Sequence, residues 1–160
     1  MSYYLLHKNR AALDRIVAAA NPKPAALTGA TSCQRSGVCC WRRPCDLYPG
    51  DPERLAAYLG LTVEETFRRH LVVDYFKGRL RVLPRRGQQT GGVYLSDDET
   101  YDIDTPCTFL VDRACAVHDA KPTGGAAWHC GMSAAEQAAL PEPEWTRGAV
   151  MALGWDGEEE

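Results

Sequence analysis

The chain has 160 residues and a net charge of -3, with 45% hydrophobic and 24% charged residues, which is typical of one globular domain over residues 1–160. The negative charge argues against nucleic acid as a partner, because nonspecific binding to phosphates needs a basic surface. No apolar run approaches the ~20 residues of a membrane span, so we expect no membrane partner.

Two helices are expected early in the chain. Residues 3–20 carry apolar side chains at helical spacing, and Asn21-Pro22 ends that run. Residues 21–32 are predicted to form a loop. Asp51-Pro52-Glu53 then predicts a helix start, with Asp51 as the capping residue, and Gly60 is expected to end this helix.

A further helix is predicted from a capping box, in which Thr62 and Glu65 satisfy orphan backbone groups, and it should run to about His70. The apolar positions of these two helices should face the core: Leu55, Tyr58, Leu59, Leu61, Val63 and Phe67.

Strands are predicted over residues 80–83 and 92–95. Arg79 and Arg81 alternate with apolar residues, which predicts a half-buried strand whose outer face is charged and solvated. The basic stretch 77–86 has no interleaved aromatic residues that would favour stacking on single-stranded nucleic acid.

A β-hairpin is predicted from residues 107–111 and 114–117, turning at residues 112–113, with Cys107 and Cys115 close to its two ends. C-terminal helices are expected within residues 132–153, one opened by a Ser133–Glu136 capping box and one over residues 143–153. Residues 157–160 should form a frayed tail. These elements together predict a small α+β domain.

The seven cysteines fall into two groups. One lies within residues 33–45 and the other within residues 107–130. The N-terminus has no apolar signal-peptide core, and the cysteine count is odd, so a secreted disulfide scaffold is not favoured. We therefore expect a cytoplasmic protein in which the two groups converge on a metal centre. Its candidate ligands are Cys33, Cys39, Cys40, Cys45, Cys107, Cys115 and Cys130.

Thiolates are soft ligands that suit both tetrahedral zinc and iron–sulfur clusters, so the metal stays open between these two. Redox thiols and buried packing are the alternatives, but vicinal Cys39 and Cys40 with two close neighbours fit simple packing poorly. Gly37 gives the first loop the freedom to fold back on an ion.

The segment Cys33-Gln34-Arg35-Ser36-Gly37-Val38-Cys39-Cys40 resembles the CxxCGxCC signature of the YkgJ-type cysteine-cluster family, whose members are described as chelating zinc or iron. The similarity continues in order through Leu59-Gly60, Cys107-Thr108-Phe109-Leu110, Cys115-Ala116-Val117-His118 and Cys130, over roughly residues 33–130. The resemblance implies a cysteine-bound metal centre within the α+β domain.

The chain departs from that signature at Ser36, which stands in place of a cysteine and is a poor ligand for a soft metal. The family has tyrosine at the position of His118, so this histidine is expected to pack rather than bind metal. His7 and His70 are expected to be structural or surface residues. Cationic residues near the cysteines are candidates for charge compensation: Arg35, Arg42, Arg43, Arg113 and Lys121.

A metal-binding protein is thus the first hypothesis. An iron–sulfur-dependent enzyme, for example with a protein-modifying methylase-like activity, and a zinc-stabilised interaction module are the alternatives. The sequence leans against an enzyme, since it has no nucleotide loop, no Ser-His-Asp set and no paired carboxylates. The acidic stretch 97–104 predicts a solvated loop, and no protein partner is indicated.

Overall fold

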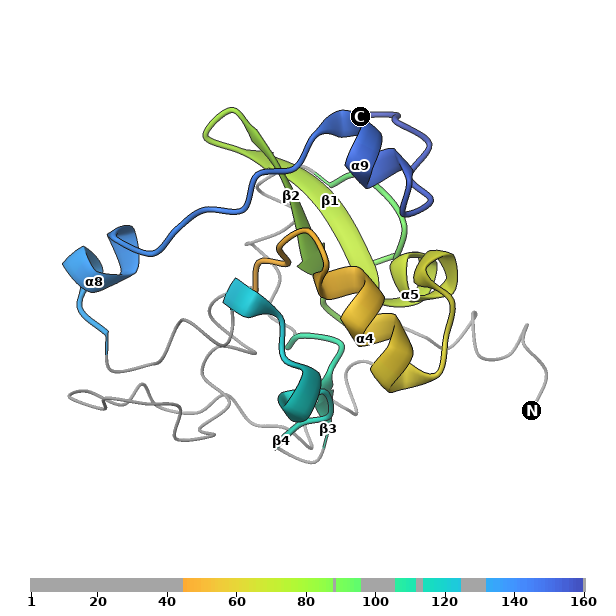
Figure 1. Cartoon of the computed structure of the whole chain (residues 1–160), viewed down its shortest axis with the longest axis horizontal. Coiled ribbons are helices and arrows are strands. Elements are labelled where there is room, and N and C mark those ends of the chain that lie inside the picture. Colours follow the sequence, from red (N-terminus) through yellow and green to blue (C-terminus); the bar gives the residue numbers. More distant parts are fainter. Residues whose placement is uncertain (1–44, 88, 96–105, 112–113, 125–131, 160) are drawn as a thin grey trace.

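The computed structural model describes residues 45–87, 89–95, 106–111, 114–124 and 132–159. Within these ranges it contains short helices and two small antiparallel sheets, which confirms the α+β class (Figure 1). Four predicted segments lie outside the described residues: the helix over 3–20, the loop over 21–32, the acidic stretch 97–104 and the hairpin turn at 112–113. The strands on either side of that turn are described.

Helix α4 (Asp51–Leu59) begins one residue earlier than predicted. Gly50, at φ 98°, is its N-cap, so the expectation that Asp51 caps the helix is wrong. Asp51 is instead the first helical residue, and its buried carboxylate accepts hydrogen bonds from the backbone N–H and the hydroxyl of Thr123, each at 2.8 Å. This carboxylate therefore joins α4 to a segment that is distant in sequence.

Helix α5 (Val63–His70) follows after Gly60, which ends α4 in the left-handed conformation as predicted. Thr62 caps α5 as predicted and accepts a 3.1 Å hydrogen bond from the N–H of Glu65, while its hydroxyl donates to the Glu65 carboxylate at 3.2 Å. Leu55 and Phe67 are fully buried, whereas Tyr58 is 49% exposed, so its predicted core position is wrong. Tyr58 lies outside the arc of α4 that carries the buried residues.

Strands β1 (Leu71–Phe76) and β2 (Arg79–Pro84) form an antiparallel hairpin. The turn uses Lys77 at φ 52° and Gly78 at φ 76°, the two positive values of a tight hairpin turn. Strand β2 contains the predicted residues 80–83, but β1 was not predicted. The predicted strand over residues 92–95 appears as an isolated parallel bridge, Val73↔Tyr94, beside β1.

The expected solvated charge on this strand is wrong for Arg81. Its side chain is buried and donates two hydrogen bonds, of 2.9 and 2.7 Å, to Asp74, which lies directly opposite it on β1. Its guanidinium also lies over the ring of Phe76, 4.4 Å from the centroid. Only Arg79 behaves as predicted, being exposed at the start of β2.

The second sheet is the predicted hairpin, made of β3 (Leu110–Val111) and β4 (Ala114–Cys115). It is shorter than expected, because a turn closed by a 3.0 Å hydrogen bond from Leu110 N–H to Cys107 O precedes β3. The 3-10 helix η1 (His118–Ala120) follows it. In Figure 1 this hairpin lies at the opposite end of the molecule from α9.

The C-terminal helices are short. Ser133 caps α8 (Ala134–Ala138) as predicted, accepting a 3.2 Å hydrogen bond from Glu136 N–H. Helix α9 (Arg147–Met151) begins at its Thr146 cap, so the prediction of a helix from residue 143 is wrong. The segment 141–146 is not helical, in keeping with two prolines that cannot donate backbone hydrogen bonds.

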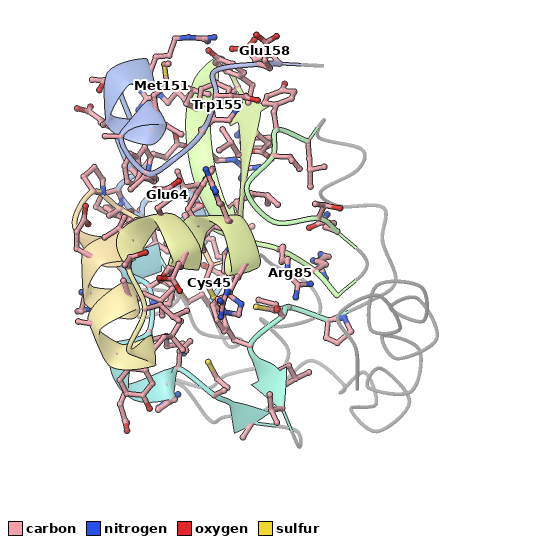
Figure 2. All side chains as sticks on the ribbon, turned by 90° about the vertical axis from the view of Figure 1, so that its right-hand side faces the viewer. Cys45, Glu64, Arg85, Met151, Trp155 and Glu158 are labelled. Carbon is pink, nitrogen blue, oxygen red and sulfur yellow. The ribbon has the colours of Figure 1, made fainter. Side chains whose placement is uncertain are left out.

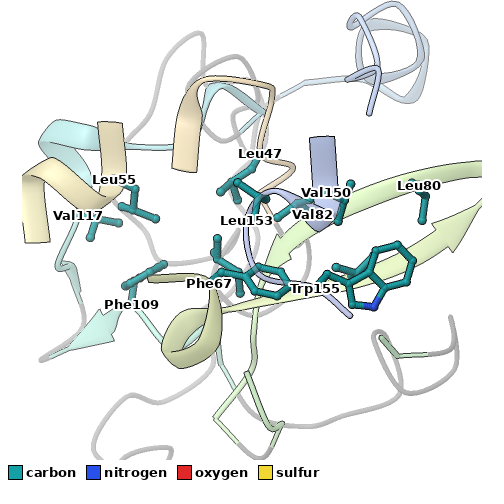
Figure 3. Close-up of a cluster of buried hydrophobic side chains, with 12 residues drawn as sticks. Leu47, Leu55, Phe67, Leu80, Val82, Phe109, Val117, Val150, Leu153 and Trp155 are labelled. Carbon is teal, nitrogen blue, oxygen red and sulfur yellow. The ribbon is translucent and has the colours of Figure 1, made fainter. Parts of the chain in front are cut away.

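One core joins these elements (Figure 3). Its side chains come from α4, α5, both sheets and the C-terminal segment, where Trp155 is 2% exposed. The end of the chain is tied to this core, since Arg147 bonds Glu159 at 2.6 Å and lies over the Trp155 ring. That hydrogen bond raises the pKa of Arg147. The predicted fraying is therefore wrong for residues 157–159.

Candidate metal centre

Cys45 is the described member of the first cysteine group. Two residues later, Leu47 forms an antiparallel bridge with Val82 of β2, with Leu47 N–H donating to Val82 O at 2.9 Å. Trp145 fixes the same residue by donating its indole N–H to Leu47 O at 2.7 Å. Cys45 lies two residues before this antiparallel bridge, in the direction of Pro84, the last residue of β2.

Cys107 lies just beyond that end of β2. It forms an antiparallel bridge with Arg86, flanked by hydrogen bonds from Gly87 N–H to Pro106 O at 3.1 Å and from Thr108 N–H to Arg85 O at 2.9 Å. Arg86 is two residues beyond Pro84, the last residue of β2. The backbone therefore brings one residue of each cysteine group to the same end of the strand.

An extended backbone continued from both bridges would put the two cysteines on one face of the strand. Directly opposed residues of an antiparallel pair point to the same side, and residues two apart on one strand do so as well. In this register the side chains of Cys45, Pro84, Arg86 and Cys107 belong to one face. Figure 2 shows Cys45 and Arg85 on the side of α5 that faces the β3–β4 hairpin, with Trp155 on the other side.

Cys115 is carried by β4, where it pairs with Leu110. Ala116 N–H donates to Phe109 O at 2.8 Å, which extends the pairing by one more bond. Cys107 and Cys115 are both half-buried and pack against the hydrophobic core. The hairpin therefore holds Cys115, and the bridge to Arg86 holds Cys107, at the edge of the core.

Gly124, which precedes Cys130 in the sequence, also lies in this region. Gly124 N–H donates to Asp46 O at 3.1 Å, next to Cys45. A side chain at position 124 would meet Asp46 O at 2.6 Å, so only glycine allows this close approach. Residues 125–131, Cys130 included, lie outside the described residues.

Positive charge is built into the same end of β2. Arg86 is only 4% exposed, and its N–H donates to the side-chain oxygen of Gln89 at 2.7 Å. Arg85 instead donates to backbone oxygens, including Arg69 O at 2.7 Å. On the other face of the strand, a guanidinium nitrogen of Arg81 lies 3.6 Å from a carboxylate oxygen of Asp46. The burial of Arg86 was not predicted, since basic residues in the stretch 77–86 are expected to face solvent.

His70 borders this region as well. Its ring is 5.2 Å from the ring of Phe109, at an angle of 41°, and its carbonyl accepts a 2.8 Å hydrogen bond from Arg85 N–H. This packing agrees with the structural role predicted for His70. His118 is half-buried in η1.

The described residues form part of the predicted ligand set. Cys33, Cys39, Cys40 and Cys130 lie outside them, as do Ser36, His7, Arg35, Arg42, Arg43 and Arg113. Among the residues that the structure describes, no group of three or more His, Cys, Asp or Glu side chains could hold a metal ion. Cys45, Cys107 and Cys115 are therefore not a complete site by themselves. As half-buried soft donors they suit zinc or an iron–sulfur cluster, provided that the remaining cysteines join them.

No profile of a known protein family, no curated protein and no solved structure matches this chain. The resemblance to the cysteine-cluster family therefore stays a prediction from the cysteine pattern. In the described part of the chain, no helix has the length and apolar character needed to cross a membrane.

Proposed function

We propose that this protein binds a metal through its two cysteine groups, holding zinc or an iron–sulfur cluster with ligands drawn from Cys33, Cys39, Cys40, Cys45, Cys107, Cys115 and Cys130. One observation carries the proposal: Leu47, two residues after Cys45, pairs with Val82 of β2, and Cys107 pairs with Arg86, two residues beyond the end of β2.

Four further features support it. The hairpin holds Cys115 against the same core, and Gly124 starts the path to Cys130 beside Asp46. The three thiols that the structure describes are half-buried, which limits competition from water for a bound metal. The cysteine spacing resembles that of the YkgJ-type family. We accordingly place the protein in the cytoplasm, where thiols remain reduced and available to metals.

Metal analysis and a visible spectrum on protein purified without oxygen test the proposal. Zinc thiolate centres absorb no visible light, whereas iron–sulfur centres are brown, so the spectrum also identifies the metal. We expect close to one equivalent of a zinc centre or of a cluster. Protein that purifies without metal and takes up neither zinc nor iron with sulfide would overturn the proposal.

Variants locate the ligands. Cys45→Ser and Cys107→Ser should each lower the metal content, because a hydroxyl is a poor ligand for a soft metal. Thr108→Ser is the matched control, since it alters the neighbour of Cys107 and leaves every thiol in place. Equal metal content in all three variants would remove these cysteines from the site.

A further inference from the structure

We infer that residues 146–159 form a C-terminal latch, a segment that closes over one face of the β1–β2 hairpin and opens as a unit while the hairpin stays paired. Arg147 is its clasp and sets how often it opens. This inference goes beyond the proposed function and requires no bound metal. Three features of the segment carry it: its backbone hydrogen bonds are internal, its contacts with the hairpin are apolar, and one exposed ion pair joins its two ends.

The backbone hydrogen bonds of the latch are internal. Gly154 N–H donates to Met151 O at 3.0 Å, and the indole N–H of Trp155 donates to Glu158 O at 3.3 Å. Within the part of the chain that the structure describes, no backbone hydrogen bond joins residues 146–159 to another segment. Opening the latch therefore breaks no backbone pairing with the described remainder of the fold.

The chain is anchored immediately before the latch. Trp145 donates its indole N–H to Leu47 O at 2.7 Å, which fixes this residue to the segment beside β2. Residues 141–146 are not helical and include Pro141 and Pro143. In Figure 1 this segment runs as an extended connection into α9. Movement of the latch therefore begins after Trp145.

Apolar side chains hold the latch against the hairpin. Val150, Leu153 and Trp155 are no more than 3% exposed and belong to the hydrophobic core. The hairpin residues of that core share one face, because they are directly opposed or two apart on β1 and β2: Leu71, Val73, Tyr75, Leu80 and Val82. Figure 3 shows Val150 beside Val82. Apolar contacts have no required direction, so the latch can leave this face without changing the strand pairing.

Arg147 joins the two ends of the latch. Its guanidinium donates to the Glu159 carboxylate at 2.6 Å and to Gly157 O, and it lies over the Trp155 ring, 4.9 Å from the centroid. The Glu159 hydrogen bond and, more weakly, Tyr75 of β1 raise the pKa of Arg147. The side chains of Arg147 and Glu159 are 50% and 37% exposed, so salt weakens their attraction. The clasp is therefore sensitive to charge and to ionic strength.

The test is hydrogen exchange of the full chain, read by mass spectrometry for peptides of the latch and of the β1–β2 hairpin. It compares Glu159→Gln and Arg147→Gln with Glu158→Gln as the matched control. Glu158 contributes its backbone N–H and carbonyl to the described contacts, and its side chain makes no ion pair among them. The control thus removes the same charge from the adjacent position and leaves the clasp in place.

Glu159→Gln should raise the exchange rate of the latch by up to about fivefold, the range expected for an exposed ion pair. Arg147→Gln should raise it further, because it also loses the contacts with Gly157 O and the Trp155 ring. Glu158→Gln should match wild type, and the hairpin should keep its protection in every variant. Salt at about 1 M should speed latch exchange in wild type and not in Glu159→Gln, because it screens the exposed pair.

Two results would overturn the inference. If latch and hairpin amides of wild type exchange at the same rate and with the same urea dependence, the segment opens only when the whole domain unfolds. If Glu159→Gln and Arg147→Gln exchange like Glu158→Gln, there is no clasp. Neither readout measures metal, so a failure here leaves the proposed function standing.

Discussion

Replacing Arg81 with methionine should lower the free energy of unfolding by about 3–5 kcal/mol, the usual cost of removing one partner from a buried ion pair. Arg81 is 8% exposed and Asp74 is fully buried, with two hydrogen bonds of 2.9 and 2.7 Å between them. Asp46 is a further carboxylate 3.6 Å from the guanidinium. Methionine restores volume but no charge, so both carboxylates lose their cation. A typical domain has only about 5–15 kcal/mol of stability, so the effect is large.

The assay is urea unfolding followed by tryptophan fluorescence, at equal metal content for every variant. Adding Asp74→Leu to Arg81→Met should recover most of the loss, because an apolar pair of similar volume replaces a buried ion pair at little cost. Arg79→Met is the control: Arg79 and Glu142 are both 54% exposed and 3.6 Å apart, so this pair should contribute no more than about 1 kcal/mol. Equal stability of Arg81→Met and Arg79→Met would refute the argument.

Three further predictions concern the candidate metal centre and the loops around it. Gly124→Ala should destabilise the fold by about 1–3 kcal/mol and weaken metal retention, because its Cβ would meet Asp46 O at 2.6 Å. Gly148→Ala is its control, having open space in α9 and an expected gain of about 0.5–1 kcal/mol in urea unfolding. A chelator should speed amide exchange over residues 33–45 but not over residues 3–20, because metal is the expected organiser of a loop with little apolar content; unchanged exchange in the loop would contradict this. Ser36→Cys should slow metal release to a chelator if this position is a vacant ligand site, and equal release rates would leave the vacant-site hypothesis without support.

Local features of the fold were predictable because each depends on a few adjacent residues. The Thr62 and Ser133 caps and the Gly60 stop follow from hydrogen-bonding capacity and backbone freedom alone. Strand β1 was missed because it follows α5 directly, without a turn residue, and its first three residues are apolar without alternation. The pair Lys77-Gly78 does contain the signal for a tight hairpin turn. A two-residue turn at these positions puts Asp74 opposite Arg81 and so predicts their pairing.

The candidate site was predictable in its ligand types and less so in its surroundings. Soft donors in two groups, one of them associated with a hairpin, can be recognised from spacing. The burial of Arg86 cannot, because it depends on the bridge to Cys107, a residue twenty-one positions away. Basic residues after a strand usually face solvent, and only the tertiary pairing shows that this one does not.

The way in which the cysteines are held bears on what metal binding would do to the fold. Cys45 is positioned through the Leu47–Val82 bridge, and Cys107 through its bridge with Arg86. Both anchors are backbone pairings at the end of β2, and Leu47 and Val82 belong to the hydrophobic core. These contacts are made between protein groups alone. A metal would therefore find this part of its site already in place, and its binding energy would go mainly into ordering the remaining cysteines around it. This differs from a zinc finger, whose whole fold depends on the ion. The β1–β2 hairpin should consequently persist in the metal-free protein.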